Sequence, residues 1–310
     1  MKNSNGNGIL YASFTAFLWG FLAIAIKVAV NDIPPVTVVW FRFFTAFVLL
    51  GIWTLIFRKN DFSIFRKPPW MLFVAGLFLG LNYLGFISGI NYVSPSASQI
   101  FIQIGPVSFA IAGIIVFKER VNWKHILGFL MVITGIGLFY SEQISELIGS
   151  EGKYTLGMVL ILGGGLSWAT FASLQKKLVQ TYSPNQLNLF IYGLCATLFL
   201  PFVSFAKFPG LVAGDWLLLS FLGLNTVLAY GSLALAIKYT QATTVSVIIT
   251  LNPVITFVIM AILSQTDVSW IEKESFSLLS IVGALTVLGG ALIVILAGRI
   301  NKRPKKEAEL

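Results

Sequence analysis

Residues 17–27 have the sequence FLWGFLAIAIK, and residues 166–176 have the sequence LSWATFASLQK. Each segment lies in a long apolar run, with a tryptophan at its third position and a lysine at its eleventh. The spacing of 149 residues between the two copies indicates that the chain contains one structural unit twice. Because a helix that spans a bilayer needs about 20 mostly apolar residues, both copies are predicted to be membrane spans.

The composition of the 310-residue chain supports this interpretation. Hydrophobic residues make up 57% of it and charged residues 11%, and the mean hydropathy is +0.87. A soluble domain carries about 25% charged residues. The composition of this chain is therefore not that of a soluble enzyme, a nucleic-acid-binding protein or a disordered chain. The single cysteine, Cys195, excludes an internal disulfide, and the single histidine, His125, leaves little for a metal site. We therefore expect no metal and no cofactor.

Ten apolar runs are long enough to cross the bilayer as helices, the form that satisfies backbone polar groups in lipid. They cover approximately residues 8–30, 37–57, 70–90, 95–117, 124–140, 155–176, 185–206, 215–237, 242–263 and 277–297. The sequence therefore predicts an all-α polytopic membrane protein with short loops and tails.

The distribution of lysine and arginine predicts the orientation, because these residues concentrate on the cytoplasmic side of membrane proteins. Sixteen of the 21 lie on the side of the N-terminus, including those in the loop at 58–67 and in the basic tail at 301–310. Three, Lys153, Lys207 and Lys273, lie on the other side. Both termini are therefore predicted to be cytoplasmic, in the inner membrane.

The repeat extends along the whole chain. Pro35 and Pro184 keep the offset of 149, while Gly76, Tyr83, Tyr92 and Pro106 recur at an offset of 147 as Gly223, Tyr230, Tyr239 and Pro253. The predicted halves are residues 1–141 and 152–300, joined by an acidic linker at 141–151. Because five spans is an odd number, the second half must enter the membrane from the opposite side. Inverted repeats of this kind are common in secondary transporters.

The order of the sequence motifs resembles that of a known protein family. In the first half the motifs are Trp19-Gly20, Lys27, Pro34-Pro35, Arg42-Phe43, Tyr92, residues 95–98 (PSAS), Pro106, residues 118–120 (KER) and the glycines from Gly128 to Gly137. Each half resembles an EamA domain of the drug/metabolite transporter superfamily. The resemblance implies ten helices in two inverted halves, a central cavity lined mainly by spans 1, 3, 4, 6, 8 and 9, and export or exchange of small metabolites by alternating access.

The second half departs from this pattern at two charged positions. Thr266 stands where the counterpart of Glu119 is expected, and Ile191 stands where the counterpart of Arg42 is expected. Any function of these two charges is therefore predicted to depend on the first half alone.

Four charged residues in or near spans could have roles of their own. Arg42 lies about 10 Å inside its span, where a charge is costly. It is expected either to pair with a substrate carboxylate or phosphate, to anchor the outer gate, or to extend its long stem to water. Lys27 is expected to extend to water, Lys176 to mark the topology only, and Glu119 to pair with its basic neighbours in sequence.

Several amides and prolines also fall within spans. The amides are Asn82, Gln99, Gln103, Asn225 and Asn252. Each is expected to hold helices together, and at least one of the group is expected to bind substrate. Pro106 and Pro253 are expected to kink their spans, either as a shared hinge or cavity bend or only to improve packing.

Four aromatic residues, Trp19, Tyr83, Trp168 and Tyr230, lie near mid-span and are paired by the repeat. Tryptophans at this depth do not fit the interfacial belt of membrane proteins. They either pack in the core or line an aromatic, largely apolar cavity, which would suit amphipathic or aromatic metabolites.

No Asp or Glu lies well inside a predicted span, and this bears on the mechanism. Proton-coupled carriers usually use an intramembrane carboxylate or histidine, so facilitated diffusion or exchange is expected. We interpret the chain as a secondary transporter of small organic metabolites, such as amino acids or related amphipathic compounds, and not as an enzyme. The alternative is a lipid or lipid-linked-intermediate flippase on the same fold. The expected partners are a small-molecule substrate and membrane lipid, without nucleic acid, and the chain is expected to act as a monomer or homodimer.

Overall fold

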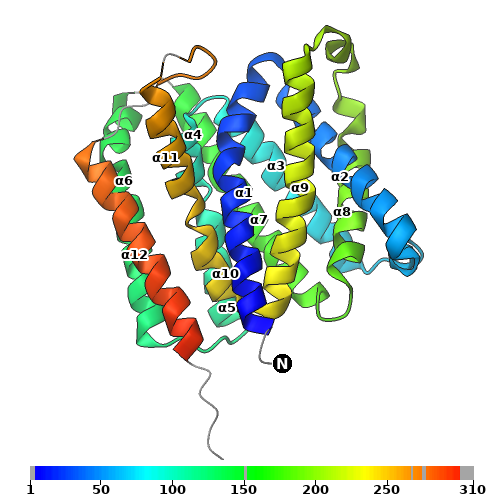
Figure 1. The fold of residues 1–310 in the computed structure, drawn as a ribbon, viewed down its shortest axis with the longest axis horizontal. Helices are drawn as coiled ribbons and strands as arrows, with labels where there is room; N and C mark the ends of the chain where they lie inside the picture. Colours follow the sequence, from blue (N-terminus) through cyan, green and yellow to red (C-terminus); the bar gives the residue numbers. More distant parts are fainter. Residues whose placement is uncertain (1–3, 150–151, 267, 274–276, 301–310) are drawn as a thin grey trace, which may run out of the picture.

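The computed structural model describes residues 4–149, 152–266, 268–273 and 277–300. These residues form α-helices joined by short loops and 3-10 turns, with no strand among them (Figure 1). The helices are α1 (Ser4–Asp32), α2 (Pro35–Phe57), α3 (Trp70–Ile90), α4 (Pro95–Phe101), α5 (Ile104–Ile115), α6 (Trp123–Gly149), α7 (Gly152–Leu178), α8 (Pro184–Phe199), α9 (Ala213–Tyr239), α10 (Ala242–Ile249), α11 (Asn252–Ser264) and α12 (Leu278–Ile300). The predicted all-α fold is confirmed.

Ten apolar helical segments are present in the described part of the chain. Eight are long and apolar enough to cross a membrane, and two of these, Pro95–Ile115 and Ala242–Ser264, each combine two successive helices. Two shorter apolar stretches, Trp123–Leu138 and Leu278–Val294, lie in α6 and α12. The start of α1 and the end of α12 lie at the same end of the molecule (Figure 1), as an even number of spans requires.

The two halves pack against each other as an inverted pair. Helix α1 lies along α9, and α7 lies along α3, so the first and third spans of each half exchange partners. Helices α6 and α12 pack side by side at the edge of the molecule (Figure 1). Their shared glycine pattern explains the close approach, because a methyl group added at Gly135 would lie 2.7 Å from the backbone oxygen of Gly283, and one at Gly128 would lie 2.7 Å from that of Gly290.

Two spans are broken near their middle. Helix α4 ends at Phe101 and α5 begins at Ile104, while α10 ends at Ile249 and α11 begins at Asn252. Pro106 and Pro253 lie in the first turn after each break. Proline is tolerated there because the first N–H groups of a helix have no intrahelical acceptor. The breaks place turn residues and helix ends in the interior of the bundle.

The predicted linker between the halves is helical over most of its length. Residues 141–149 continue helix α6. Their sequence, SEQISELIG, contains good helix formers and no glycine or proline before Gly149. Residues 150–151 and the predicted basic tail at 301–310 lie outside the described residues.

Candidate substrate cavity

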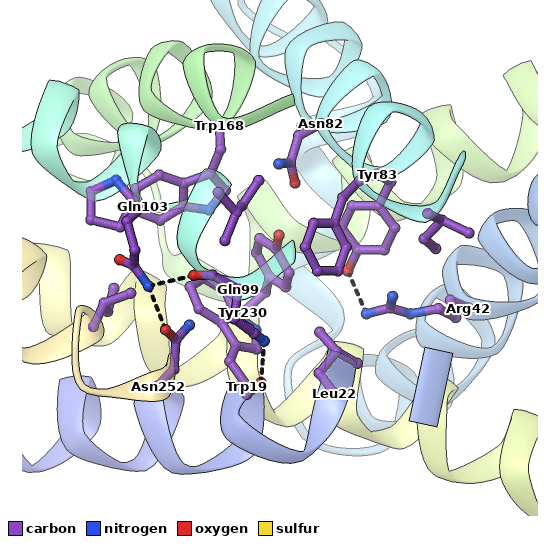
Figure 2. A pocket seen from close by; sticks show the side chains of 15 residues that line it. Trp19, Leu22, Arg42, Asn82, Tyr83, Gln99, Gln103, Trp168, Tyr230 and Asn252 are labelled. Carbon is purple, nitrogen blue, oxygen red and sulfur yellow. Dashed lines mark hydrogen bonds between the residues drawn. The ribbon is translucent and has the colours of Figure 1, made fainter. Parts of the chain in front are cut away.

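A cavity lies in the centre of the bundle, where the inverted helix pairs and the two broken spans meet (Figure 2). The cavity has a volume of about 60 Å³, so it is narrow. Fifteen residues from α1, α2, α3, the two broken spans, α7 and α9 line it: Trp19, Leu22, Arg42, Asn82, Tyr83, Phe86, Ile87, Gln99, Ile102, Gln103, Pro106, Trp168, Tyr230, Ile249 and Asn252. Ligand sites are typically mostly apolar, with a few polar groups that orient the ligand.

The aromatic residues that the repeat pairs lie together in this cavity. The ring centroids of Trp19 and Trp168 lie 5.9 Å apart in an edge-to-face arrangement. Tyr230 lies 5.4 Å from Trp19 and 5.7 Å from Tyr83, again between ring centroids. Each half thus contributes one tryptophan and one tyrosine, and the four rings both pack together and line the cavity.

Arg42 is held inside the bundle and does not extend to water, because only 2% of it is exposed. Its Nε donates to Oγ1 of Thr226 at 3.1 Å, and its Nη2 donates to the hydroxyl of Tyr83 at 3.4 Å. The guanidinium carbon also lies 4.5 Å from the centre of the Tyr83 ring, a distance at which cation–π attraction is significant. These contacts fix the plane of the guanidinium at one end of the cavity (Figure 2).

Arg42 has no anionic partner among the residues that the structure describes. It is the one charged residue that lines the cavity, and no described Asp or Glu forms an ion pair with it. The two hydrogen bonds to Thr226 and Tyr83 use two of the five N–H donors of its guanidinium. Three donors on a buried cation therefore face the interior without a carboxylate to accept from them.

The amides gather at the opposite end of the cavity, where the two span breaks meet (Figure 2). Nε2 of Gln103 donates to Oδ1 of Asn252 at 2.7 Å and to the backbone oxygen of Gln99 at 3.0 Å. Nε2 of Gln99 donates to the backbone oxygen of Trp19 at 3.0 Å. Asn82 also lines the cavity, but its Nδ2 donates to the backbone oxygen of Gly164 at 2.9 Å and so joins α3 to α7.

Three buried polar atoms of cavity-lining residues have no hydrogen-bond partner among the described residues. They are Nε1 of Trp19, Nε1 of Trp168 and Oε1 of Gln103. Buried polar atoms are paired in the great majority of cases, so unpaired ones need an explanation. A bound polar ligand or a water molecule would provide the missing partners.

Two of the predicted site residues lie elsewhere. Asn225 does not line the cavity; its Nδ2 donates to the backbone oxygen of Leu18 at 2.9 Å, which joins α9 to α1. Pro253 follows its span break but is likewise not a lining residue. The sequence reasoning missed Thr226, the partner of Arg42. It also missed five apolar lining residues: Leu22, Phe86, Ile87, Ile102 and Ile249.

The structure adds contacts for three charged residues and corrects the interpretation of two of them, Lys176 and Glu119. Lys27 is half-buried, and its Nζ donates to the backbone oxygens of Ile90, at the end of α3, and of Val93, just after it, at 3.1 Å each. Lys176 does more than mark topology: its Nζ lies 3.0 Å from Oε1 of Glu119. Glu119 therefore pairs across the halves, and not with its neighbours in sequence.

Nothing in the described chain resembles a metal centre, since no group of three His, Cys, Asp or Glu side chains there could hold an ion. An inverted repeat of apolar helices with broken spans around a mostly apolar central cavity is the architecture of a membrane transporter. The EamA-like transporter family matches the chain twice, over residues 6–141 and 155–296. The protein therefore belongs to the EamA-like transporter family and is a multi-pass membrane transporter.

Similar proteins agree with this assignment. The chain is 34% identical over 307 residues to a protein described as an uncharacterized inner membrane transporter, YhbE, of Escherichia coli K12, with 97% of this chain and 94% of the relative covered. It is 30% identical over 295 residues to an uncharacterized transporter of Haemophilus influenzae, with 94% and 96% covered. A solved crystal structure of a protein with 17% identity matches 96% of this chain and 100% of its own with a TM-score of 0.75, which shows a shared fold.

Proposed function

We propose that this protein is a secondary transporter that carries a small amphipathic organic metabolite with an anionic group, such as an amino acid or a related compound, by alternating access. The anionic group binds at Arg42, and an aromatic or apolar body lies against the tryptophans and tyrosines of the cavity. In this proposal the transporter lies in the inner membrane with both termini in the cytoplasm, and it exports its substrate, exchanges it or lets it diffuse.

The observation that carries the proposal is a buried arginine, Arg42, that has no carboxylate partner among the described residues. A charge inside a membrane protein is costly and pairs with a counter-charge or serves a ligand. Arg42 is oriented by Thr226 and Tyr83, and three of its N–H donors remain uncommitted. A carboxylate or phosphate that accepts two of them would compensate the charge with the planar, two-bond geometry that arginine favours.

The other end of the cavity supports an amphipathic substrate with a second polar group. The unpaired Nε1 atoms of Trp19 and Trp168 are donors, and the unpaired Oε1 of Gln103 is an acceptor. An ammonium group can donate to such an oxygen, and an aromatic face attracts cations. The narrow space between the two ends favours a compact or flat molecule over a bulky one.

Substrate counterflow in proteoliposomes tests the proposal. Vesicles loaded with a panel of amino acids, nucleosides and related metabolites are assayed for uptake of the labelled compound, each acid alongside its uncharged amide. We expect counterflow for an acid and none for its amide. Equal transport of acid and amide would contradict the anionic group, and movement of fluorescent lipids without counterflow of any acid would favour the flippase.

Labelling of engineered cysteines tests the proposed orientation. In intact cells, an impermeant thiol reagent should reach a cysteine at Glu272 but not one at Arg66. The basis is the concentration of lysine and arginine on the side of Arg66. Labelling of the cysteine at Arg66 from outside would reverse the orientation.

A further inference from the structure

A second hollow lies outside the cavity, at the end of the molecule where α1 begins (Figure 1). Its volume is about 760 Å³, and most of its lining residues are polar or charged. The start of α1, residues 118–120 after α5, and the ends of α7 and α9 all contribute to it. We call this hollow, which is lined by Lys118, Arg120, Lys176 and Lys238, the basic cleft.

The basic cleft carries an excess of positive charge. Four basic residues and one acidic residue of the described chain line it. The acid, Glu119, is already compensated, because its Oε1 lies 3.0 Å from Nζ of Lys176 and its two oxygens accept from the first turn of α10. Lys118, Arg120 and Lys238 are exposed and form no ion pair within the described part of the chain. Three positive charges therefore line the cleft without a described counter-charge.

The convergence of these charges is more than topology requires. A cytoplasmic end is expected to carry lysine and arginine, but they need not line one hollow. Lys118 and Arg120 come from the first half of the chain, and Lys238 comes from the second. Like charges held close together repel one another, and an anion bound between them offsets this cost.

A buried histidine adds a hydrogen-bond acceptor to the basic cleft. His125 lines the cleft, and only 1% of it is exposed. Oδ1 of Asn122 accepts from the backbone N–H of His125 at 3.1 Å and lies 2.7 Å from its Nδ1. That contact is much shorter than the 3.4 Å from the N–H of Asn122 to the same ring nitrogen, so the proton of the neutral ring is assigned to Nδ1. Nε2 is then an acceptor without a partner among the described residues, and an ammonium or hydroxyl group of a ligand can donate to it.

The basic cleft and the cavity share their helices. Trp168 and Tyr230 line the cavity, and Lys176 and Lys238, eight residues further along α7 and α9, line the cleft. At 1.5 Å per residue, about 12 Å of helix separates the two levels. Both sites combine positive charge with a buried acceptor that has no described partner. They therefore fit the same class of ligand, an acid with a second polar group.

We propose that the basic cleft is an outer binding site for the anionic metabolite, where it is held on its way to or from Arg42. The inference rests on the proposed function, because it takes an acid as the substrate. Lys118, Arg120 and Lys238 attract the carboxylate or phosphate group, while Glu119 stays bound to its own partners and leaves these charges free. A positive cleft of this kind raises the local concentration of anions and their rate of association. In the proposed orientation it collects the metabolite on the cytoplasmic side.

Thiol reagents of opposite charge test the electrostatics of the cleft. In a Cys195→Ser background, Gln180→Cys places a reporter at an exposed lining residue. Its rates of reaction with an anionic and a cationic methanethiosulfonate are compared in nanodiscs of phosphatidylcholine. Relative to a free thiol, the ratio should favour the anionic reagent. It should fall about twofold in Lys238→Gln and about tenfold when Lys118→Gln and Arg120→Gln are added.

The matched control is Lys59→Gln. It removes an exposed lysine after α2, a helix that contributes no residue to the cleft, and it should leave the ratio unchanged. A ratio equal to that of a free thiol, or an equal fall in Lys59→Gln and Lys238→Gln, would mean that the cleft has no local field of its own and would overturn the inference.

Protection of the same cysteine tests the binding of an acid. Benzoate, a compact aromatic acid, should slow labelling by an uncharged maleimide in a saturable manner, and benzamide, its uncharged counterpart, should not. Protection should persist in Arg42→Ala, since the cleft is separate from the cavity. It should weaken about threefold in Lys238→Gln, a change at an exposed side chain, and vanish in the triple variant. No protection by benzoate, or equal protection by benzamide, would overturn the binding site.

Anionic lipid is the competing occupant of the cleft. Replacement of part of the phosphatidylcholine by phosphatidylglycerol should leave the protection by benzoate in place, whereas its loss would assign the cleft to a lipid headgroup and overturn the inference. The assay also separates the two proposals. If benzoate protects the cysteine while no acid shows counterflow, the outer site stands and the proposed function fails. If an acid shows counterflow but neither it nor benzoate protects the cysteine, the proposed function stands and the outer site fails.

Discussion

The two halves of the molecule share a scaffold but differ at two of its charged positions. Trp19 and Trp168 occupy equivalent positions and touch in the cavity, and both halves break a span before a proline. Arg42, however, corresponds to the buried Ile191 of the second half, and Glu119 corresponds to the exposed Thr266. The comparison teaches that both copies of the repeat build the cavity, whereas the charge proposed to bind the substrate comes from the first half alone.

The largest expected effect in this comparison is the loss of Arg42. Arg42→Ala should lower the initial transport rate in proteoliposomes by about 100-fold or more, because a two-bond charged contact contributes roughly 3 kcal/mol. Arg42→Lys should recover part of the rate if charge alone matters, and little of it if the planar geometry matters. The control is Arg58→Ala, which removes an exposed arginine just after the same helix.

Exchange of the two positions sharpens this prediction. The double variant Arg42→Ile, Ile191→Arg keeps the composition but moves the charge into the second half. It should not recover transport, because Thr226 and Tyr83 orient a guanidinium at position 42 only. Recovery of the rate would mean that the halves are interchangeable, and near-normal transport by Arg42→Ala would remove this residue from the site.

The aromatic pair should show a smaller and symmetric effect. Trp19→Ala and Trp168→Ala should each weaken the apparent affinity for substrate by about tenfold, or roughly 1.4 kcal/mol. Each variant removes one ring of the same edge-to-face pair and one unpaired donor. Concentration-dependent uptake measures the change, and Trp123→Ala, at an exposed tryptophan, is the control. A change in only one of the two variants would show that the rings have unequal roles.

Thr226 should have a moderate effect that acts through Arg42. Thr226→Val removes the acceptor of Nε of Arg42 while it preserves the volume of the side chain. A hydrogen bond between membrane helices contributes about 0.6 kcal/mol, so we expect an affinity about threefold weaker. Thr197→Val is the matched control, since that exposed hydroxyl donates only to its own helix, at Gly193. The loss should vanish in an Arg42→Ala background; a loss that persists there would assign Thr226 a separate role.

Removal of the proton gradient should have the smallest effect. No Asp, Glu or His lines the cavity among the described residues, and proton coupling usually needs such a group within the membrane. Downhill uptake should therefore continue at about the same rate when a protonophore is added and the substrate gradient is maintained. Complete loss of uptake would show that a group outside the cavity couples transport to protons.

Much of the fold follows from the sequence, because hydrophobic length and internal repetition are local properties. The ten apolar runs and the glycine pattern shared by α6 and α12 can be seen without any knowledge of contacts. The polar and aromatic residues near mid-span also indicated most of the cavity, since such residues are costly in lipid. The linker at 141–149 was recognised from its acidic residues and its place between the repeats, whereas its helical structure follows from its content of helix-forming residues.

The contacts between the halves could not be predicted in the same way. Glu119 lies next to Lys118 and Arg120 in sequence, yet its partners are Lys176 and the first turn of α10. Thr226 lies 184 residues from Arg42, and its hydroxyl gives no pattern that distinguishes it from other threonines in spans. Asn225, the preceding residue, was predicted from the sequence as a substrate-binding residue, but its side chain donates to the backbone oxygen of Leu18 instead. The packing of one half against the other determines which side chains become the partners of Arg42 and Glu119.

The hydrogen bond between Gln103 and Asn252 has a mechanical consequence. It ties the break of one span to the break of its inverted counterpart at 2.7 Å. Two broken helices would otherwise have two independent joints, and each could bend without the other. The hydrogen bond couples the two joints, because bending at one joint alone would stretch it, and it therefore favours movements in which both joints bend together. In the alternating access proposed above, such coupling would favour states in which one end opens as the other closes.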